Sequence, residues 1–344
     1  MDWAERAKQL WGRVSTRNRR RLVFYPSLVL AVLLPLRWLT YMPGESYHGP
    51  FGPLNLEEEL YKTDLEKHVR MLGGTIGDRN IARPGTLEKT RDYLEKELAS
   101  MNFVVTKQTF YVGSVACDNL SVDIAGAAKA QEIVLVGAHY DSAEDAAGAD
   151  DNGSGVAATL ALAKVFRGKT PGRTVRFVLF ANEEPPYFWT DTMGSVQYAR
   201  AARARGDAIV AMLSLETIGY YKEEAGTQHY PFPMSAFYGD KGDFIGFVGN
   251  TASRGLVHEI IGAFRGNTQF PSEGAALPAF IAGVGWSDQW SFWKEGYPGV
   301  MVTDTAPFRN PNYHTKSDLP DTLDYPRFAR VVRGLEHVID VLAR

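Results

Sequence analysis

The stretch Gly137–Gly155, GAHYDSAEDAAGADDNGSG, carries residues that could bind a metal ion. His139 and Asp141 come directly after the apolar run Ile133–Val136, and the acidic pair Asp150-Asp151 follows in a Gly-rich turn. An imidazole and carboxylates held by one loop are suitable ligands for zinc. Asp, Asn and Gly are also ordinary turn residues, so this stretch alone leaves a purely structural turn as the alternative.

Two other ligands are not favoured by the same stretch. Gly153-Ser-Gly155 has the spacing of a dinucleotide-binding fingerprint, but it follows an acidic loop where that motif requires a strand. The acidic loop also lacks the alternating oxygen ligands and the terminal Glu of a calcium-binding hand. Of the ligands considered, a metal such as zinc is the one that suits this stretch, and a purely structural turn stays the alternative until other candidate ligands are found.

Further candidate ligands follow other apolar, β-branched segments that we predict to be strands. Glu183-Glu184 come after one of these segments, Glu216 ends another, and His314 follows the last. Ligands at the carboxyl ends of parallel strands meet at one edge of an open α/β sheet. We therefore predict a single cluster of imidazoles and carboxylates at that edge. The predicted strands are 133–136, 173–180, 208–215 and 299–303.

Helical segments alternate with these strands. Apolar residues at helical spacing predict the helices, and alternating or β-branched residues predict an antiparallel pair at one edge of the sheet. The expected fold class is α/β: a three-layer α/β/α sandwich with a mixed, mainly parallel sheet. The predicted helices are 55–72, 86–101, 156–166 and 193–205, and the predicted edge strands are 103–112 and 119–124.

Composition excludes several classes of protein. The 344-residue chain is 45% hydrophobic, which is enough for a large globular core. Its 37 basic and 40 acidic residues give a formal net charge of −3, so we expect no nucleic-acid partner. Cys117 is the only cysteine, which excludes an internal disulfide and a thiolate-rich zinc site.

The N-terminal segment predicts a transmembrane signal-anchor. Residues 1–21 are rich in basic residues, and residues 22–42 are long enough to span about 31 Å as a helix, about one bilayer core. The absence of a small-residue cleavage site after them favours an uncleaved anchor over a removed signal peptide. The basic end is expected to stay cytoplasmic, with the rest of the chain on the periplasmic or extracellular side. Residues 43–54 are expected to form a linker and residues 55–344 the globular domain.

Five motifs in this order, GAHYDS, GADDNGSG, NEE, LSLETIGY and NYHTKSD, resemble those of the co-catalytic di-zinc aminopeptidases, metallopeptidase family twenty-eight. The resemblance covers roughly residues 55–344 and implies a zinc peptidase domain with two Zn2+ ions per chain. It implies His139, Glu216 and a shared Asp150 as ligands of one zinc. It implies Glu184, His314 and the same Asp150 as ligands of the other.

The resemblance also assigns roles beside the ligands. Glu183 is implied to be the general base of peptide hydrolysis, which passes a proton from water to the leaving amine. Asp141 is implied to be the carboxylate that orients His139. The bond between Asp150 and Asp151 is implied to be cis. The implied substrate is a peptide with a free N-terminus, whose α-amino group one of the metals binds.

The chain departs from the family pattern at two positions. Position 216 is Glu where the best-known members have Asp, and its longer arm still reaches a metal. Gln289 stands where many relatives have His, so no substrate-stabilising role is carried over to it. Aromatic residues in loops, Trp189, Trp286 and Trp290 among them, are candidates for the wall of an apolar substrate pocket.

Two alternatives to an aminopeptidase remain open. A glutaminyl-cyclase-like acyltransferase uses a related fold with a single zinc, and its family forms lack the first His, whereas His139 is present in this chain. A non-catalytic membrane scaffold on the same fold would have lost ligands, and all five implied ligands are present. The number of bound metal ions and the hydrolysis of aminoacyl substrates distinguish these classes.

Overall fold

The computed structural model describes residues 3, 5–6, 11, 14–232 and 234–344 of the chain. These residues form two units, Met1–Tyr41 and the larger, compact Met42–Arg344. Much of the predicted basic segment 1–21, namely residues 1–2, 4, 7–10 and 12–13, lies outside the described residues.

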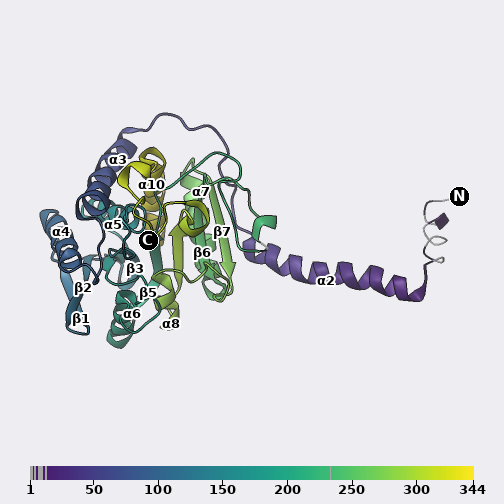
Figure 1. Cartoon of the computed structure of the whole chain (residues 1–344), viewed down its shortest axis with the longest axis horizontal. Helices are drawn as coiled ribbons and strands as arrows, with labels where there is room; N and C mark the ends of the chain where they lie inside the picture. Colours follow the sequence, from purple (N-terminus) through teal and green to yellow (C-terminus); the bar gives the residue numbers. More distant parts are fainter. Residues whose placement is uncertain (1–2, 4, 7–10, 12–13, 233) are drawn as a thin grey trace. The chain divides into compact units, whose positions relative to one another are not determined.

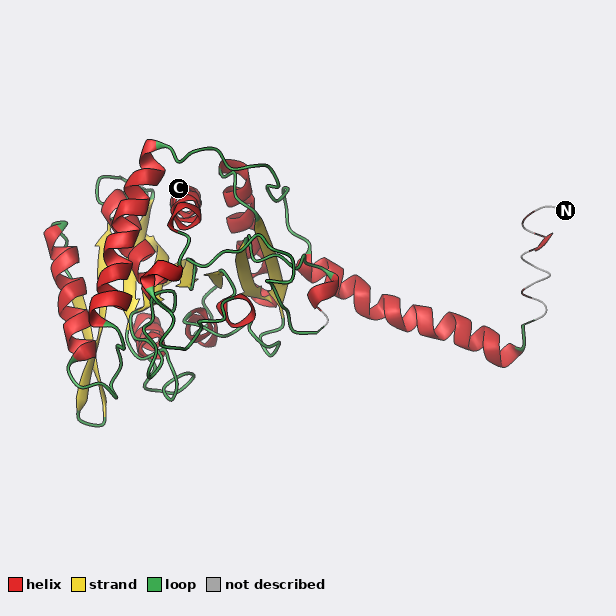
Figure 2. Cartoon of the chain, turned by 45° about the horizontal axis from the view of Figure 1, so that its top comes forward, coloured by secondary structure: helices red, strands yellow, loops and turns green. Residues whose placement is uncertain are grey.

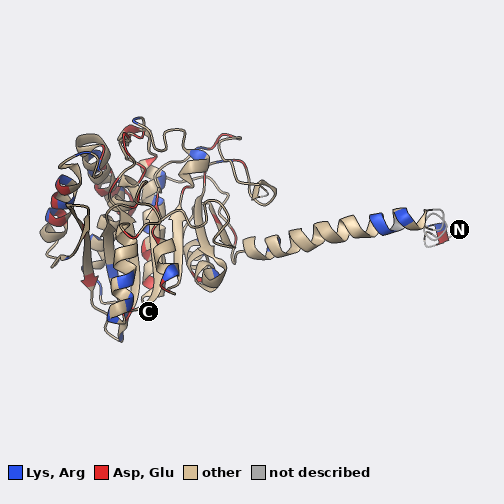
Figure 3. Cartoon of the chain, turned by 60° about the horizontal axis from the view of Figure 1, so that its bottom comes forward, with Lys and Arg blue, Asp and Glu red and all other residues tan. Residues whose placement is uncertain are grey.

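Helix α2, Thr16–Thr40, is long and apolar enough to cross a membrane. Ser15 caps its N-terminus by accepting a hydrogen bond from the backbone N–H of Asn18. Basic residues gather at the N-terminal end of the helix, and the rest is almost entirely uncharged (Figure 3). A signal sequence near an N-terminus passes the same test of length and composition. The structure therefore has the apolar N-terminal helix that the sequence predicts, as a membrane span or a signal sequence.

The larger unit is built around an eight-stranded mixed sheet (Figure 1). The strand order is β1-β2-β4-β3-β5-β8-β6-β7, and β4, β3, β5 and β8 are parallel neighbours. β1 and β2 are the antiparallel pair at one edge, and β6 runs antiparallel to β8 and parallel to β7. The strands are β1 (Thr106–Val112), β2 (Val115–Ile124), β3 (Lys129–His139), β4 (Arg173–Phe180), β5 (Ala208–Glu216), β6 (Ile245–Asn250), β7 (Ser272–Leu277) and β8 (Gly299–Thr303).

Helices cover both faces of the sheet, which is the middle layer of three (Figure 2). α3, α4, α5, α7 and α10 bury the larger hydrophobic core against one face, and α6 and α8 bury a smaller core against the other. The helices of this unit are α3 (Leu56–Val69), α4 (Thr86–Ser100), α5 (Gly153–Phe166), α6 (Gly194–Arg205), α7 (Arg254–Asn267), α8 (Gln289–Lys294), α9 (Ala306–Arg309) and α10 (Tyr325–Leu342).

Strand β3 shows why the central strands consist of consecutive apolar residues. Ile133 and Leu135 belong to the core on the α6 side, whereas Val134 and Val136 belong to the core on the α5 side. Successive side chains of a strand point to opposite faces, so a strand covered on both faces needs apolar residues at every position. This double burial fixes the position of the strand end that carries His139.

The predicted α/β sandwich with a mixed sheet is confirmed. Strands β4 and β8 begin and end at the predicted residues, and β1 and β2 form the predicted pair at a sheet edge. The strand predicted at 133–136 is longer, because β3 pairs with both β4 and β5 over most of its length. The elements predicted from the sequence do not include β6, β7, α7, α8, α9 or α10.

Candidate metal centre

The candidate site lies where the four parallel strands end. His139 is the last residue of β3 and Glu216 the last residue of β5. Glu183 and Glu184 lie in the loop that follows β4, and His314 lies in the segment that follows β8 and α9. The structure brings these five side chains together at one edge of the sheet, as the distances below establish.

His139 faces three carboxylates. Its Nε2 atom lies 3.2 Å from Oε2 of Glu216, 3.4 Å from Oδ1 of Asp151 and 3.8 Å from Oε2 of Glu183. All four residues are buried. Two ligand atoms of one tetrahedral zinc ion lie about 3.3 Å apart. The first two spacings therefore suit a shared ion better than the third, and we group Asp151 rather than Glu183 with His139 and Glu216.

His314 faces the other side of Asp151. Its Nε2 atom lies 3.0 Å from Oδ2 of Asp151 and 3.1 Å from Oε2 of Glu184. The side chain of His314 is 32% exposed, whereas those of Asp151 and Glu184 are 4% exposed, so the cluster meets solvent at His314. Asp151 thus presents one carboxylate oxygen to each histidine.

The assignment of Asp150 to the shared position is wrong by one residue. Oδ1 of Asp150 accepts the backbone N–H of Gly219 at 3.0 Å, and Oδ2 accepts Nδ2 of Asn310 at 3.0 Å. In the described part of the chain, Asp150 has no ion pair with either histidine, and Asp151 has one with each. The cis peptide bond also lies one residue later than implied, between Asp151 and Asn152. Neighbouring side chains of this turn point in different directions, so only one of the two carboxylates faces the cluster.

Two residues that the sequence did not single out hold this turn. The carboxylate of Asp318 accepts the backbone N–H of Asp150 and of Asp151, at 3.0–3.1 Å. Asn152 caps α5 and donates its Nδ2 to the carbonyl oxygen of Leu215, at the end of β5. Asp318 could have been proposed as a site residue from the sequence, because it is the final residue of the motif NYHTKSD.

Asp141 connects the first histidine to the paired glutamates. Its two carboxylate oxygens accept the backbone N–H of Glu183 at 3.1 Å and of Glu184 at 3.0 Å. Its Oδ1 atom also lies 3.4 Å from Nδ1 of His139. These contacts are consistent with the orienting role implied for Asp141, and they extend that role to the glutamate loop.

The Ser287-Asp288-Gln289 segment lies behind Glu216. The hydroxyl of Ser287 donates to Oε2 of Glu216 at 2.5 Å. Burial raises the pKa of Asp288 to about 7. Gln289 is also buried and donates its Nε2 to the carbonyl oxygen of Val284. Ser287 is therefore the residue of this segment that orients a candidate ligand, and Gln289 supports the adjacent loop.

Several polar atoms of the cluster lack a hydrogen-bond partner among the described residues. They are both ring nitrogens of His139, Nε2 of His314, Oδ1 of Asp151 and Oε1 of Glu184. Buried polar atoms of native proteins are nearly always paired. A cation between these atoms satisfies them together, so the donor set fits a metal ion.

The electrostatics of the cluster also favour a cation. Burial, reinforced by the negative charge of Asp151, raises the pKa of Glu184 to about 7. Burial opposes the protonation of His314, but Asp151 and Glu184 outweigh it and raise the pKa of His314 to about 10. Burial, together with Glu216 and Glu184, also raises the pKa of Glu183 well above its ordinary value, although His139 opposes the shift. These carboxylates share an excess of negative charge that a bound cation neutralises.

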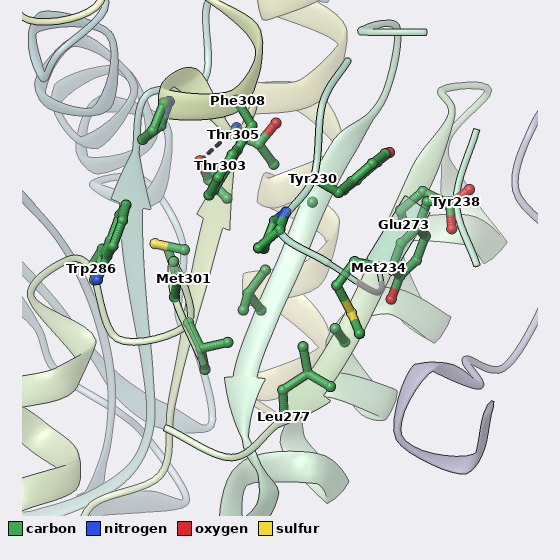
Figure 4. Close-up of a pocket in the computed structure, with 18 of the residues that line it drawn as sticks. Tyr230, Met234, Tyr238, Glu273, Leu277, Trp286, Met301, Thr303, Thr305 and Phe308 are labelled. Atoms are coloured by element: carbon green, nitrogen blue, oxygen red, sulfur yellow. Dashed lines mark hydrogen bonds between the residues drawn. The ribbon is translucent and has the colours of Figure 1, made fainter. Parts of the chain in front are cut away.

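An apolar pocket of about 120 Å³ adjoins the cluster. Glu216 and Tyr313 line it, and the ring of Tyr313 stacks on that of His314 at 3.8 Å between centroids. Of the loop aromatic residues singled out from the sequence, Trp286 lines the pocket (Figure 4). Trp189 stacks instead on Trp290, at 5.5 Å between centroids.

A mixed α/β/α sandwich with buried histidines and carboxylates at the carboxyl edge of its parallel strands has the architecture and the donor set of a metallopeptidase. The model of peptidase family M28 matches residues 119–339, and the chain belongs to this family. The resemblance inferred from the five motifs is thereby confirmed. Membership makes the chain a hydrolase of the peptidase class, with peptides as the class of substrate.

Several known proteins are similar to the chain. The chain is 32% identical over 330 residues to the uncharacterized protein YfbL of Escherichia coli (strain K12), covering 92% of this chain and 97% of that one. BSAP, a zinc aminopeptidase from Bacillus subtilis, superposes with a TM-score of 0.63 and 13% identity over 81% of this chain and 94% of its own. The glutaminyl cyclase of Fimbriiglobus ruber superposes with a TM-score of 0.60 and 20% identity over 86% and 98%.

The two structural likenesses are likenesses of fold. Family membership and the histidine–carboxylate donor set together indicate a metal such as zinc.

Proposed function

We propose that the chain is a zinc-dependent aminopeptidase that binds two zinc ions and removes N-terminal residues from peptides. One observation carries the proposal. Asp151 faces His139 with one carboxylate oxygen and His314 with the other, inside a cluster whose ring nitrogens lack partners among the described residues. Carboxylates that join two such groups are suited to a pair of metal ions.

The distances divide the residues into two donor groups. His139, Glu216 and Oδ1 of Asp151 would hold one ion, and His314, Glu184 and Oδ2 of Asp151 the other. Zinc bound there supplies a water of lowered pKa and polarises the carbonyl group of the scissile bond.

Glu183 is the residue that we assign to proton transfer. Its carboxylate is buried beside His139 but is farther from it than those of Glu216 and Asp151. Its backbone N–H donates to Asp141, which fixes the point from which its side chain enters the cluster. In this role Glu183 accepts a proton from the attacking water and donates it to the leaving amine.

The substrate class is assigned from the open side of the cluster. The cluster meets solvent at His314, so the zinc ion that His314, Glu184 and Asp151 would hold is the accessible one. A free α-amino group offers that ion a nitrogen ligand, whereas an acylated N-terminus offers none. We therefore assign peptides with a free N-terminus to this site, which makes the enzyme an exopeptidase.

We also propose that α2 is an uncleaved membrane anchor. The helix spans 25 residues, and its basic residues gather at its N-terminal end. Basic residues favour the cytoplasmic side of a membrane. The segment before α2 is then cytoplasmic, and the unit Met42–Arg344 lies on the periplasmic or extracellular side.

The test uses the full-length chain purified in detergent and supplied with zinc. We expect two zinc ions per chain by elemental analysis and release of an amino acid from peptides with a free N-terminus. Acetylated versions of the same peptides should not be cleaved, and a chelator should abolish the release until zinc is restored. One zinc ion or none, with no release from either peptide, contradicts the proposal.

The Glu183→Gln variant tests the proton-transfer role. We expect it to keep two zinc ions and to lose about 10²- to 10⁴-fold in kcat, the usual contribution of a general acid–base group. Glu144→Gln, at an exposed residue of the loop after β3, is the matched control and should retain wild-type kcat. Wild-type kcat in Glu183→Gln excludes this residue as the base.

A glutaminyl cyclase is the second candidate function, because an enzyme of that activity shares this fold. The presence of His139 in a complete first donor group favours two metal ions over the single zinc expected for a cyclase. A peptide that begins with Gln distinguishes the two functions. An aminopeptidase releases free glutamine, whereas a cyclase releases ammonia and leaves a pyroglutamyl peptide.

A further inference from the structure

The apolar pocket beside the cluster lies over the half of the sheet formed by β8, β6 and β7. α7 packs against these strands on the other face. On the pocket face the cover comes from the loops that carry Tyr230 and Trp286, from the short 3-10 helix that begins at Met234, and from Phe308 of α9 (Figure 4). Because Glu216 lines the near end, a side chain of a peptide bound at the cluster can enter the pocket directly.

One row of residues crosses the pocket floor. Strand pairing aligns Glu216 with Thr303, Thr303 with Gly246, and Gly246 with Glu273. Paired residues of neighbouring strands point to the same face of a sheet, so Glu216 and Glu273 share the pocket face. Gly246 has no side chain of its own between Thr303 and Glu273, and a Cβ atom there would meet the backbone oxygen of Thr303 at 3.1 Å. Glu273 thus lies at the far end of a trough that starts at the cluster.

Glu273 lines a pocket whose other lining residues are mostly apolar. It is partly buried, and it lies across the pocket from Trp286 (Figure 4). Within the described residues, its carboxylate accepts no hydrogen bond and has no ion pair within 4.0 Å. The nearby Arg265 donates instead to Ser272, Pro43 and Gly44. A carboxylate in apolar surroundings is stabilised when a cation pairs with it.

The length of the trough suits a long side chain. Three strand spacings of about 4.8 Å separate the Cα atoms of Glu216 and Glu273, about 14 Å in total. The two glutamate side chains shorten this gap from both ends. The apolar stem of a Lys or Arg side chain can pack on Met301, Val248 and Ala275 of the pocket floor, and its cationic head can pair with Glu273. A Leu or Phe side chain fills the near part alone.

We propose that Glu273 selects peptides whose N-terminal residue is Lys or Arg. The stem of that residue lies in the apolar trough, and its charged head pairs with the carboxylate of Glu273. This inference rests on the aminopeptidase activity proposed above, which names the cluster as the place where the N-terminal residue binds.

The test compares arginine with citrulline, which has the same length and shape but no charge. Full-length, zinc-loaded chain in detergent is assayed for kcat/KM on arginyl, citrullinyl, lysyl and leucyl p-nitroanilides. We expect arginine to exceed citrulline by about 10- to 100-fold, the range of one charge-assisted hydrogen bond. In Glu273→Gln the ratio of arginine to citrulline should fall to about one.

Asp243→Asn is the matched control. Asp243 is close enough to raise the pKa of Glu273 through its negative charge, but it does not line the pocket. Removal of this charge should leave the ratio of arginine to citrulline at least 10-fold. Equal loss in both variants would mean that general negative charge, and not a contact with Glu273, sets the preference, and this overturns the inference.

Calorimetric binding of arginine amide and citrulline amide to the same preparations separates this inference from the proposed function. Tighter binding of arginine amide, lost in Glu273→Gln, supports the inference even if no substrate is cleaved. Cleavage of leucyl substrate without any preference for arginine over citrulline leaves the aminopeptidase intact. In that case Glu273 is only a charged residue of the edge strand β7, a common protection against strand pairing between molecules.

Discussion

Asp151 connects the two halves of the candidate metal centre, because each of its carboxylate oxygens faces a different histidine. Asp150, its neighbour in the sequence, is equally buried but serves the structure. It accepts hydrogen bonds from Gly219 and Asn310, which tie the turn after β3 to the segments that follow β5 and α9. Two adjacent aspartates thus have different roles, one facing the histidines and one stabilising the turn, and single substitutions can distinguish these roles.

Asp151→Asn should lose zinc, whereas Asp150→Asn should mainly lose stability. An amide at position 151 cannot serve as an anionic ligand toward both histidines, so we expect zinc affinity to fall by more than about 100-fold, since loss of an outer partner alone costs 10- to 100-fold. An amide at position 150 can accept one of its two hydrogen bonds, and the donor left unpaired costs about 1–3 kcal/mol. Zinc per chain and the free energy of unfolding measure the two effects. If Asp150→Asn loses zinc and Asp151→Asn does not, Asp150 is the shared ligand, as the family resemblance implied.

The types and the approximate positions of the site residues could be predicted from the sequence, because strand ends carry them. His139 and Glu216 end strands that their apolar composition already indicates. The choice between Asp150 and Asp151 could not be predicted, because it depends on the direction of each side chain in a turn. Asp318 and Asn152 set that direction through hydrogen bonds to distant segments.

At the scale of elements, the start of α5 holds the Asp151 turn against the end of β5. A Cβ atom on Gly155 would come within 3.0 Å of both Oδ1 of Asn152 and the carbonyl oxygen of Leu215. Gly155→Ala therefore has to push the helix away from the strand. We expect a loss of about 1–3 kcal/mol in the free energy of unfolding, as for other overpacked sites, together with weaker zinc binding.

Gly255→Ala is the control for this substitution. Gly255 lies in the first turn of α7, and a Cβ atom there meets no atom within 4 Å. Ala is favoured over Gly in a helix, so this variant should gain up to about 1 kcal/mol and keep its zinc. Similar effects of the two variants in denaturant unfolding would show that packing at Gly155 is not specific.

His68 on α3 couples the stability of the larger unit to pH. It is buried against Tyr93 of α4, with 2.6 Å between Nδ1 and the hydroxyl, and burial, followed by the charge of Lys67, lowers its pKa from 6.5 to about 4. The unfolded chain therefore binds a proton at a higher pH than the folded chain does. The contribution of neutral His68 to stability is complete above pH 6.5 and is lost as the pH falls toward 4.

We expect His68→Gln to weaken this dependence on pH. Between pH 7.5 and pH 5 the protonation of His68 in the unfolded chain costs about 2 kcal/mol of stability, which the variant does not lose. Urea unfolding at the two pH values measures the difference. His48→Gln, at an exposed position, is the control that should behave as wild type. An identical loss of stability in wild type and His68→Gln contradicts the assignment.

Elements differ in how well local sequence predicts them. β4 and β8 are rich in β-branched residues, and their bounds agree with the prediction. β6 and β7, IGFVGN and SEGAAL, contain glycine and few β-branched residues. The pairing of β6 with β8, the pairing of β7 with β6, and packing against α7 determine them. α10 had a usable signal, since Phe328, Val331, Leu335, Val338 and Leu342 recur at helical spacing and are buried.

At the scale of the whole molecule, α2 determines whether the mature chain stays attached to a membrane. α2 is apolar over most of its length and has Pro26 and Pro35 inside it, which a membrane helix tolerates. A removed signal peptide and a retained anchor predict different mature chains. An intact mass that includes residues 1–41, measured on protein purified from membranes, supports the anchor, and a mass that begins after α2 contradicts it.

Two arginines within the apolar part of α2 should weaken the association with the membrane. Each costs about 2.5–3.5 kcal/mol near the centre of a bilayer, so Leu30→Arg with Leu33→Arg should move the chain out of the carbonate-resistant membrane pellet. Leu30→Ala with Leu33→Ala is the matched control and should stay in the pellet.

Protease protection tests the orientation of the chain. In sealed inside-out vesicles, added protease should leave Met42–Arg344 intact until detergent opens the vesicles, because the proposed orientation places this unit in the lumen. Digestion without detergent would reverse the orientation and place the proposed peptidase on the cytoplasmic side.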